Sequence, residues 1–197
     1  MTREAEDALR GLLSRSGIEA ESEAARRLLR YLDLLTKWNL RVNLTAGTDW
    51  PAIGPQFQEG IWAAGLYPDA SRHHLDIGSG AGFPAIVLRI LVPRIRLDLV
   101  ESRAKKAVFL ETVVDALGLP GTKVHPMRLE EQLRERAEVW DCISWKGLKL
   151  AEKDLLALRA HAHSRTQFWV FHGRQLAVEN PESFSRSFRH VRGEKCP

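Results

Sequence analysis

The feature that most constrains this fold is a glycine-rich stretch near the middle of the chain, "HLDIGSGAGFP" at residues 74–84. A short segment typical of a β-strand, "HHLDIG", leads into it, and a helical segment, "PAIVLRILV", follows it. Glycines at positions 78, 80 and 82 let the backbone bend tightly and approach a ligand without an intervening side chain. A turn of this kind between a strand and a helix is typical of nucleotide-binding sites in parallel sheets.

Strand and helix patterns alternate from residue 73 onward. Further strands are predicted at "IRLDLVE", "TKVHP", "WDCIS" and "QFWVF", and further helices at "KKAVFLETVVDALG", "RLEEQLRER" and "AEKDLLALRAHA". This alternation indicates βαβ units, and therefore an α/β fold with a parallel sheet. The tail, "SFSRSFRHVRGEKCP", is expected to add one more strand at an edge.

The region before the glycine turn is predicted to be helical. The first helix ends before Gly17, the second begins at an N-cap, Ser22, and a third is capped by Asp49. We therefore predict a small N-terminal helical subdomain at residues 1–65 and an α/β domain at residues 66–197. One apolar face of the first helix is formed by Ala5, Leu9, Leu12 and Leu13.

The spacing of the glycines discriminates between ligands. A dinucleotide-binding turn requires a third glycine at the position of Phe83, so a nicotinamide cofactor is disfavoured. Glycines at every second position behind an acid, Asp76, resemble the turn of S-adenosylmethionine (AdoMet) methyltransferases. The next strand ends at Glu101, about 20 residues on, which is the usual distance of an acid that accepts from ribose hydroxyls. The alternatives are a turn without a ligand and a solvated carboxylate at a helix start.

Five segments from both regions carry a more specific resemblance: "KWNLRVNLTA" (37–46), "LDIGSGAGFPAIVL" (75–88), "LVESRAKKAVFL" (99–110), "ALGL" (116–119) and "MRLEE" (127–131). Together they resemble the bacterial small-subunit rRNA guanine-N7 methyltransferases, the RsmG or GidB family. The resemblance implies a Rossmann-like class I AdoMet-dependent methyltransferase fold. It also implies AdoMet as the cofactor and methyl transfer to a guanine N7 in 16S rRNA of the small ribosomal subunit.

The resemblance also implies a set of cofactor-binding residues. Arg128, Leu129 and Glu130 follow the third strand, where the adenine ring is expected, although they also simply begin an amphipathic helix. The full set expected to bind the cofactor is Asp76, Gly78, Ser79, Gly80, Gly82, Phe83, Glu101, Ser102, Arg128, Leu129, Glu130 and Ser144.

The implied reaction requires little from catalytic side chains. Guanine N7 carries an unprotonated lone pair, so no general base has to remove a proton before attack. Three residues are the catalytic candidates: Trp145 to stack on a base, Lys146 to supply a cation, and His172 to donate to a phosphate or the base. Trp145 could instead pack in the core, and His172 could be structural. Cys142 lies in mid-strand and is expected to be a buried thiol.

The chain departs from the family pattern on the acceptor side. Gln56, Glu59 and Gly60 stand where the family has a His and an Asp-Ser pair. Residues 144–146 replace a Ser-Arg-Ala after the fourth strand, and His172 replaces a Lys after the fifth. The chain also stops early for the family's last hairpin. The alternatives are therefore a divergent paralogue that binds AdoMet but methylates another RNA or a small molecule, and a non-catalytic RNA-binding protein.

Composition restricts the environment of the protein. The net charge of +4 suits an RNA partner, and basic residues cluster at 26–41, 103–106 and 186–195, although such clusters are often solvated faces. Two cysteines, Cys142 and Cys196, form no disulfide framework and lack metal-ligand spacing, so no metal site is predicted. The charged start and the absence of a long apolar run predict a cytoplasmic protein without a membrane span. We expect a monomer.

Overall fold

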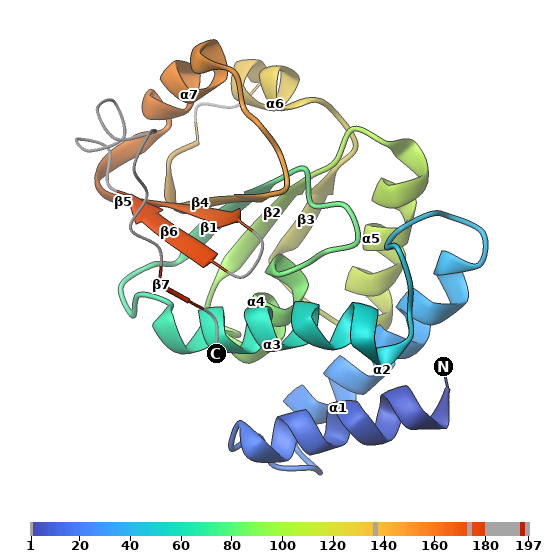
Figure 1. Cartoon of the computed structure of the whole chain (residues 1–197). Helices are drawn as coiled ribbons and strands as arrows, with labels where there is room; N and C mark the ends of the chain where they lie inside the picture. The colour runs from blue at the N-terminus through green and yellow to red at the C-terminus, as the bar shows by residue number, and fades with distance from the viewer. Residues whose placement is uncertain (1, 136–137, 173–174, 180–193, 196–197) are drawn as a thin grey trace.

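The computed structural model describes residues 2–135, 138–172, 175–179 and 194–195. A central sheet has the order β3-β2-β1-β4-β5-β6-β7, in which β1 to β5 are parallel and the last two strands are antiparallel (Figure 1). The strands are β1 His73–Ile77, β2 Arg96–Val100, β3 Thr122–His125, β4 Trp140–Lys146, β5 Ala162–His172, β6 Gln175–Glu179 and β7 Glu194–Lys195.

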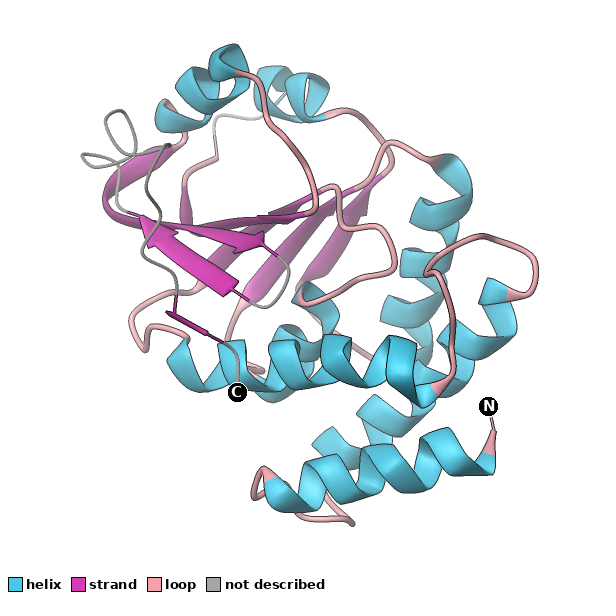
Figure 2. Ribbon diagram, in the orientation of Figure 1, coloured by secondary structure: helices cyan, strands magenta, loops and turns pink. Residues whose placement is uncertain are grey.

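Helices cover both faces of the sheet (Figure 2). One layer contains α1 to α5, which share apolar cores with one face of the sheet. The other layer contains α6 and α7, which pack on the opposite face. The helices are α1 Arg3–Arg15, α2 Glu23–Asn39, α3 Trp50–Leu66, α4 Ala85–Leu91, α5 Ala104–Leu117, α6 Leu129–Glu135 and α7 Glu152–Arg159. No helix among the described residues is long and apolar enough to cross a membrane.

The predicted end of the first helix and the predicted start of the second agree with the structure. The Ser22 hydroxyl accepts from the backbone N–H of Ala25 at 3.1 Å, and Gly17 follows α1 with a φ of 72°. Asp49 occupies the N-cap of α3 but its side chain makes no cap hydrogen bond. Pro55 leaves α3 unbroken over 17 residues. That continuity matters because α3 lies along the sheet and carries Gln56 and Glu59.

The N-terminal helices are joined to the glycine turn. The Tyr31 hydroxyl of α2 donates to the backbone oxygen of Ala81 at 2.6 Å. The rings of Tyr31, Phe57 and Phe83 pack at centroid distances of 5.1–5.7 Å. The helices thus share one core with the sheet and buttress the turn, and a domain boundary at residue 65 remains a prediction.

Two strands differ from the prediction. The strand β6 was missed because "QLAVE" is short and has no clear alternation. The strand β5 begins five residues before the predicted "QFWVF", because Thr166 donates to the backbone oxygen of Trp140 at 2.7 Å and holds the polar segment to β4. The two-residue β7 lies within the tail where an edge strand was predicted, and the basic positions 186, 189 and 192 lie outside the described residues.

Candidate active site

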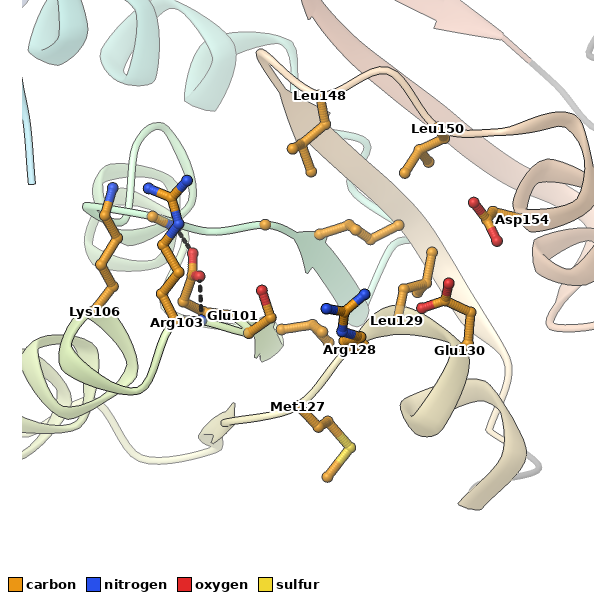
Figure 3. A pocket seen from close by; sticks show the side chains of 15 residues that line it. Glu101, Arg103, Lys106, Met127, Arg128, Leu129, Glu130, Leu148, Leu150 and Asp154 are labelled. Atoms are coloured by element: carbon orange, nitrogen blue, oxygen red, sulfur yellow. Dashed lines mark hydrogen bonds between the residues drawn. The ribbon is translucent and has the colours of Figure 1, made fainter.

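A cavity of about 440 Å³ opens at the carboxyl ends of the strands, beside the glycine turn (Figure 3). It lies where the sheet order reverses between β1 and β4, which is the usual ligand crevice of such sheets. Its size falls within the range of small-molecule sites. The lining residues are Ile77, Gly78, Gly80, Val100, Glu101, Ser102, Arg103, Lys106, Met127, Arg128, Leu129, Glu130, Leu148, Leu150 and Asp154.

The glycines have different tasks in the turn. Gly78 and Gly80 line the cavity and have φ angles of 66° and 59°, which L side chains rarely adopt. A Cβ on Gly80 would meet nothing closer than 3.7 Å, so the space in front of it is open, whereas one on Gly78 would collide with Leu148. A Cβ on Gly82 would lie 2.7 Å from Cγ1 of Ile86. Gly82 therefore serves packing, and Gly80 gives a ligand access to the backbone.

Glu101 lies directly after β2 with its carboxylate at the cavity. One oxygen accepts the backbone N–H of Gly80 at 2.8 Å, and the other accepts that of Arg103 at 2.8 Å (Figure 3). These bonds tie the turn to β2 and fix the carboxylate. Each carboxylate oxygen has two lone-pair sites, so one on each remains for an incoming hydroxyl pair.

The remaining walls combine apolar and charged groups. Met127 and Leu129 come from the segment after β3, and Leu148 and Leu150 come from the loop after β4. These four side chains offer apolar surface to a flat ring. The charged groups at the cavity are Arg103, Lys106, Arg128, Glu101, Glu130 and Asp154, which suits a ligand that carries both signs of charge.

Seven of the residues predicted to bind a cofactor line this cavity: Gly78, Gly80, Glu101, Ser102, Arg128, Leu129 and Glu130. The other five do not line it, and their contact with a cofactor stays a prediction: Asp76, Ser79, Gly82, Phe83 and Ser144. The prediction missed Leu148 and Leu150. Their position after β4, at the same edge of the sheet as the glycine turn, was the signal that could have identified them.

Asp76 and Ser144 act from beneath the turn. The Ser144 hydroxyl donates to Oδ1 of Asp76 at 2.6 Å, and Nε2 of His74 lies 2.8 Å from the same hydroxyl. Burial raises the pKa of Asp76 to about 7 and lowers the pKa of His74 to about 3. Ser79 donates to the backbone oxygen of Asp76 at 3.0 Å. This buried chain of hydrogen bonds joins β1, β4 and the glycine turn.

The structure does not bring Trp145 to the cavity. Its side chain is 1% exposed and packs in the core between the sheet and α6–α7, so it offers no free face to a base. Successive residues of a strand point to opposite faces. Lys146 accordingly points toward α3, where its ammonium group donates to Gln56 Oε1 at 2.6 Å and to Glu59 Oε1 at 2.5 Å. Burial raises the pKa of Glu59.

Three of the residues that depart from the family pattern are thus in contact, since Lys146 meets both Gln56 and Glu59. Gly60, the third departure on α3, packs against α4, because a Cβ there would lie 2.6 Å from Val87. His172 is exposed at the carboxyl end of β5 and does not line the cavity. The three predicted catalytic residues therefore do not form one site.

A second polar cluster, which the sequence did not reveal, lies under α6. The buried carboxylate of Asp98 accepts from His73 at 2.6 Å, His125 at 2.8 Å and Trp140 at 3.0 Å. These donors lower the pKa of Asp98. Ligand atoms of His73, Asp98 and Glu138 lie within 4.8 Å of one another, as in a metal site. The 2.6 Å distance is that of a hydrogen bond, so the cluster is accounted for as a network that joins four strands. Cys142 is fully buried, as predicted.

Comparison with known families identifies the chain. The family described as rRNA small subunit methyltransferase G, GidB, matches residues 24–190. The chain belongs to the GidB family. Proteins named ribosomal RNA small subunit methyltransferase G are 36% identical in Geobacillus thermodenitrificans, over 70% of this chain, and 37% identical in Roseiflexus sp., over 74%. One from Bartonella quintana is 33% identical over 80% of this chain and 74% of its own length.

The GidB match and the solved structures agree on the fold. A protein described as an O-methyltransferase from Klebsiella pneumoniae superposes with a TM-score of 0.54 and 18% identity over 71% of this chain and 64% of its own. One described as a caffeoyl-CoA O-methyltransferase from Staphylococcus aureus gives 0.51 and 12% over 71% and 65%. The predicted class I methyltransferase fold is confirmed. This chain spans 59% and 65% of the lengths of the first two GidB relatives.

Proposed function

We propose that this protein is an AdoMet-dependent methyltransferase that transfers a methyl group to guanine N7 in 16S rRNA of the small ribosomal subunit. The observation that carries the proposal is the cavity at the switch point of the sheet, with Gly80 open toward it and Glu101 fixed at its wall. Membership of the GidB family and the names of the relatives support the substrate. Such a protein would act as a monomer in the cytoplasm, where ribosomes are assembled.

The cavity residues fit AdoMet on three points. The fixed carboxylate of Glu101 has acceptor sites left for two ribose hydroxyls. The side chains of Met127, Leu129 and Leu150 provide apolar surface for the adenine ring. Gly80 leaves its backbone accessible at the rim, where the methionine part would lie.

The proposed chemistry is a displacement at carbon. AdoMet, when bound, supplies a methyl group on a positively charged sulfur. The N7 lone pair of guanine attacks the methyl carbon while the carbon–sulfur bond breaks and its electron pair stays on sulfur. No proton has to be removed, so the protein contributes alignment of the two substrates and exclusion of water. This agrees with a cavity whose lining holds no histidine.

Lys146 is the residue that we assign to the acceptor side. Its ammonium group, held by Gln56 and Glu59, lies at the carboxyl end of β4, next to the loop that forms one cavity wall. An ammonium group has three donors, and the two bonds leave one for an acceptor oxygen of the target nucleotide. The buried Glu59 fixes this ammonium group, which a surface lysine would leave mobile.

The test uses small subunits from a strain that lacks this gene. The purified protein is incubated with these subunits and isotopically labelled AdoMet, and the nucleosides of the digested 16S rRNA are separated by mass spectrometry. We expect labelled 7-methylguanosine, and at least tenfold less of it with the Glu101→Gln variant when AdoMet is limiting. Label in another nucleoside, or no transfer by a wild-type protein that binds AdoMet, would refute the assignment of the acceptor.

A second candidate is methylation of a different RNA. The contact of Lys146 with Gln56 and Glu59 favours it, because three of the departures from the family pattern meet at one place. The same labelling experiment on total RNA separates the two. Transfer to a non-ribosomal RNA with none to small subunits would support this candidate, and the reverse would exclude it.

A further inference from the structure

A second hollow, the α2–α5 groove, lies beside the cavity and shares no lining residue with it. It measures about 550 Å³ and is lined by Lys37, Trp38, Leu40, Arg41, Val42 and Lys105. Lys37 and Trp38 belong to the last turn of α2, and Leu40, Arg41 and Val42 to the loop that follows it. Lys105 is in the first turn of α5, which passes close to this loop (Figure 1). Arg103 and Lys106, on either side of Lys105, line the cavity, so the two hollows adjoin at the start of α5.

The groove combines positive charge with exposed apolar surface. Leu40 is 84% exposed, the highest value among the exposed large apolar side chains of the described residues. Lys37 forms an ion pair with Asp33 at 2.9 Å, whereas Arg41 and Lys105 have no ion-pair partner among the described residues. None of the lining residues is acidic. A solvated basic face does not require an exposed leucine in its centre, so the groove has the composition of a binding surface.

The groove is held in shape by the protein. The Asn39 side chain accepts the backbone N–H groups of Leu44 and Thr45 at 2.9 and 3.0 Å, which closes the loop after α2. Trp38 packs against Phe109 of α5 with ring centroids 5.7 Å apart. These contacts explain the "KWN" and "NLT" parts of the sequence motif, and they present Leu40 and Arg41 on a fixed turn.

We propose that the α2–α5 groove binds the RNA strand next to the target nucleotide. Arg41 and Lys105 neutralise its phosphates, and Leu40 contacts a base or sugar. RNA fits better than an acidic protein segment, because cations spaced around an apolar side chain match a repeating chain of phosphates and flat bases. The adjoining cavity would hold the cofactor of the same reaction. This inference rests on the proposed function and adds to it where the RNA lies.

The test compares two double variants with equal net charge. Arg41→Gln/Lys105→Gln removes the groove cations, and Arg15→Gln/Arg165→Gln removes two exposed cations on α1 and at the start of β5. Binding to protein-free 16S rRNA and to small subunits is measured between about 0.05 and 0.3 M salt. We expect the groove variant to bind about tenfold more weakly at 0.15 M, with a salt slope shallower by roughly 1.4, since each single-strand phosphate contact contributes about 0.7.

A third variant, Leu40→Ala, separates apolar contact from charge. It should weaken RNA binding roughly fourfold, as expected when the complex loses the burial of about one methylene group, without changing the salt slope. All variants should bind AdoMet like the wild type. Equal RNA binding by the two double variants would overturn the proposal. An effect seen with small subunits but not with protein-free RNA would mean that a ribosomal protein occupies the groove. Failure of wild-type methyl transfer would instead refute the proposed function, independently of the groove.

Discussion

The different tasks of the glycines give a prediction that separates binding from stability. Gly80 and Gly118 have nearly the same φ angle, 59° and 55°. A Cβ would meet nothing within 4 Å at Gly118, at the end of α5, and nothing within 3.7 Å at Gly80. Alanine at either position therefore carries only the left-handed backbone penalty, about 1–2 kcal/mol. For a chain of this size that corresponds to a fall of roughly 2–8 °C in Tm.

The two variants should differ only in ligand binding. Gly80 lines the cavity, so the added methyl group of Gly80→Ala occupies its rim, whereas Gly118→Ala changes nothing there. We expect thermal unfolding curves that agree within about 0.5 kcal/mol, which is the usual scatter of surface changes. We also expect AdoMet affinity, measured by calorimetry, to fall at least tenfold for Gly80→Ala alone. Unchanged AdoMet affinity of Gly80→Ala, or an equal loss of affinity in both variants, would mean that Gly80 does not face the cofactor.

Three further predictions concern buried charges. The pKa of Asp76 is raised from 3.8 to about 7, so its ionisation favours the unfolded chain and stability should fall by roughly 3 kcal/mol as the pH rises from 4 to 7. Urea unfolding of Asp76→Asn should lack this decline. The pKa of Asp98 is lowered, so its contribution is present above about pH 4 and lost below it. Asp98→Asn should therefore lose roughly 2–3 kcal/mol at pH 7 and show a weaker further loss in acid than the wild type. Lys146→Met should cost about 3–5 kcal/mol by leaving Glu59 buried without its partner, and adding Glu59→Gln should restore most of it; additive losses would contradict the pairing.

Much of the fold followed from local patterns in the sequence. The strand, glycine turn and helix at residues 73–92 were predictable because each signal concerns neighbouring residues. The short β6 was not, because five residues without a clear alternation give only a weak strand signal. The polar start of β5 was hidden for a similar reason, because Thr166 is satisfied only by the backbone of β4.

The candidate site shows the same limit. Gly80 and Glu101 could be predicted because both follow strands that end at one edge of the sheet. The orientation of Trp145 could not be predicted, because its position at the end of a strand does not tell which face of the sheet the side chain takes. The contact of Lys146 with Gln56 and Glu59 joins segments 87 or more residues apart, and no sequence spacing reports it.

A calorimetric titration of the protein with AdoMet tests whether the cavity beside Gly80 and Glu101 binds this cofactor. We expect saturable binding of AdoMet at one site. We also expect at least tenfold weaker binding by Glu101→Gln. The carboxylate has two acceptor oxygens, which serve two backbone N–H groups and two ribose hydroxyls, whereas glutamine has only one acceptor oxygen. Absence of binding by the folded wild-type protein, or equal affinity of the variant, would contradict binding of AdoMet in this cavity.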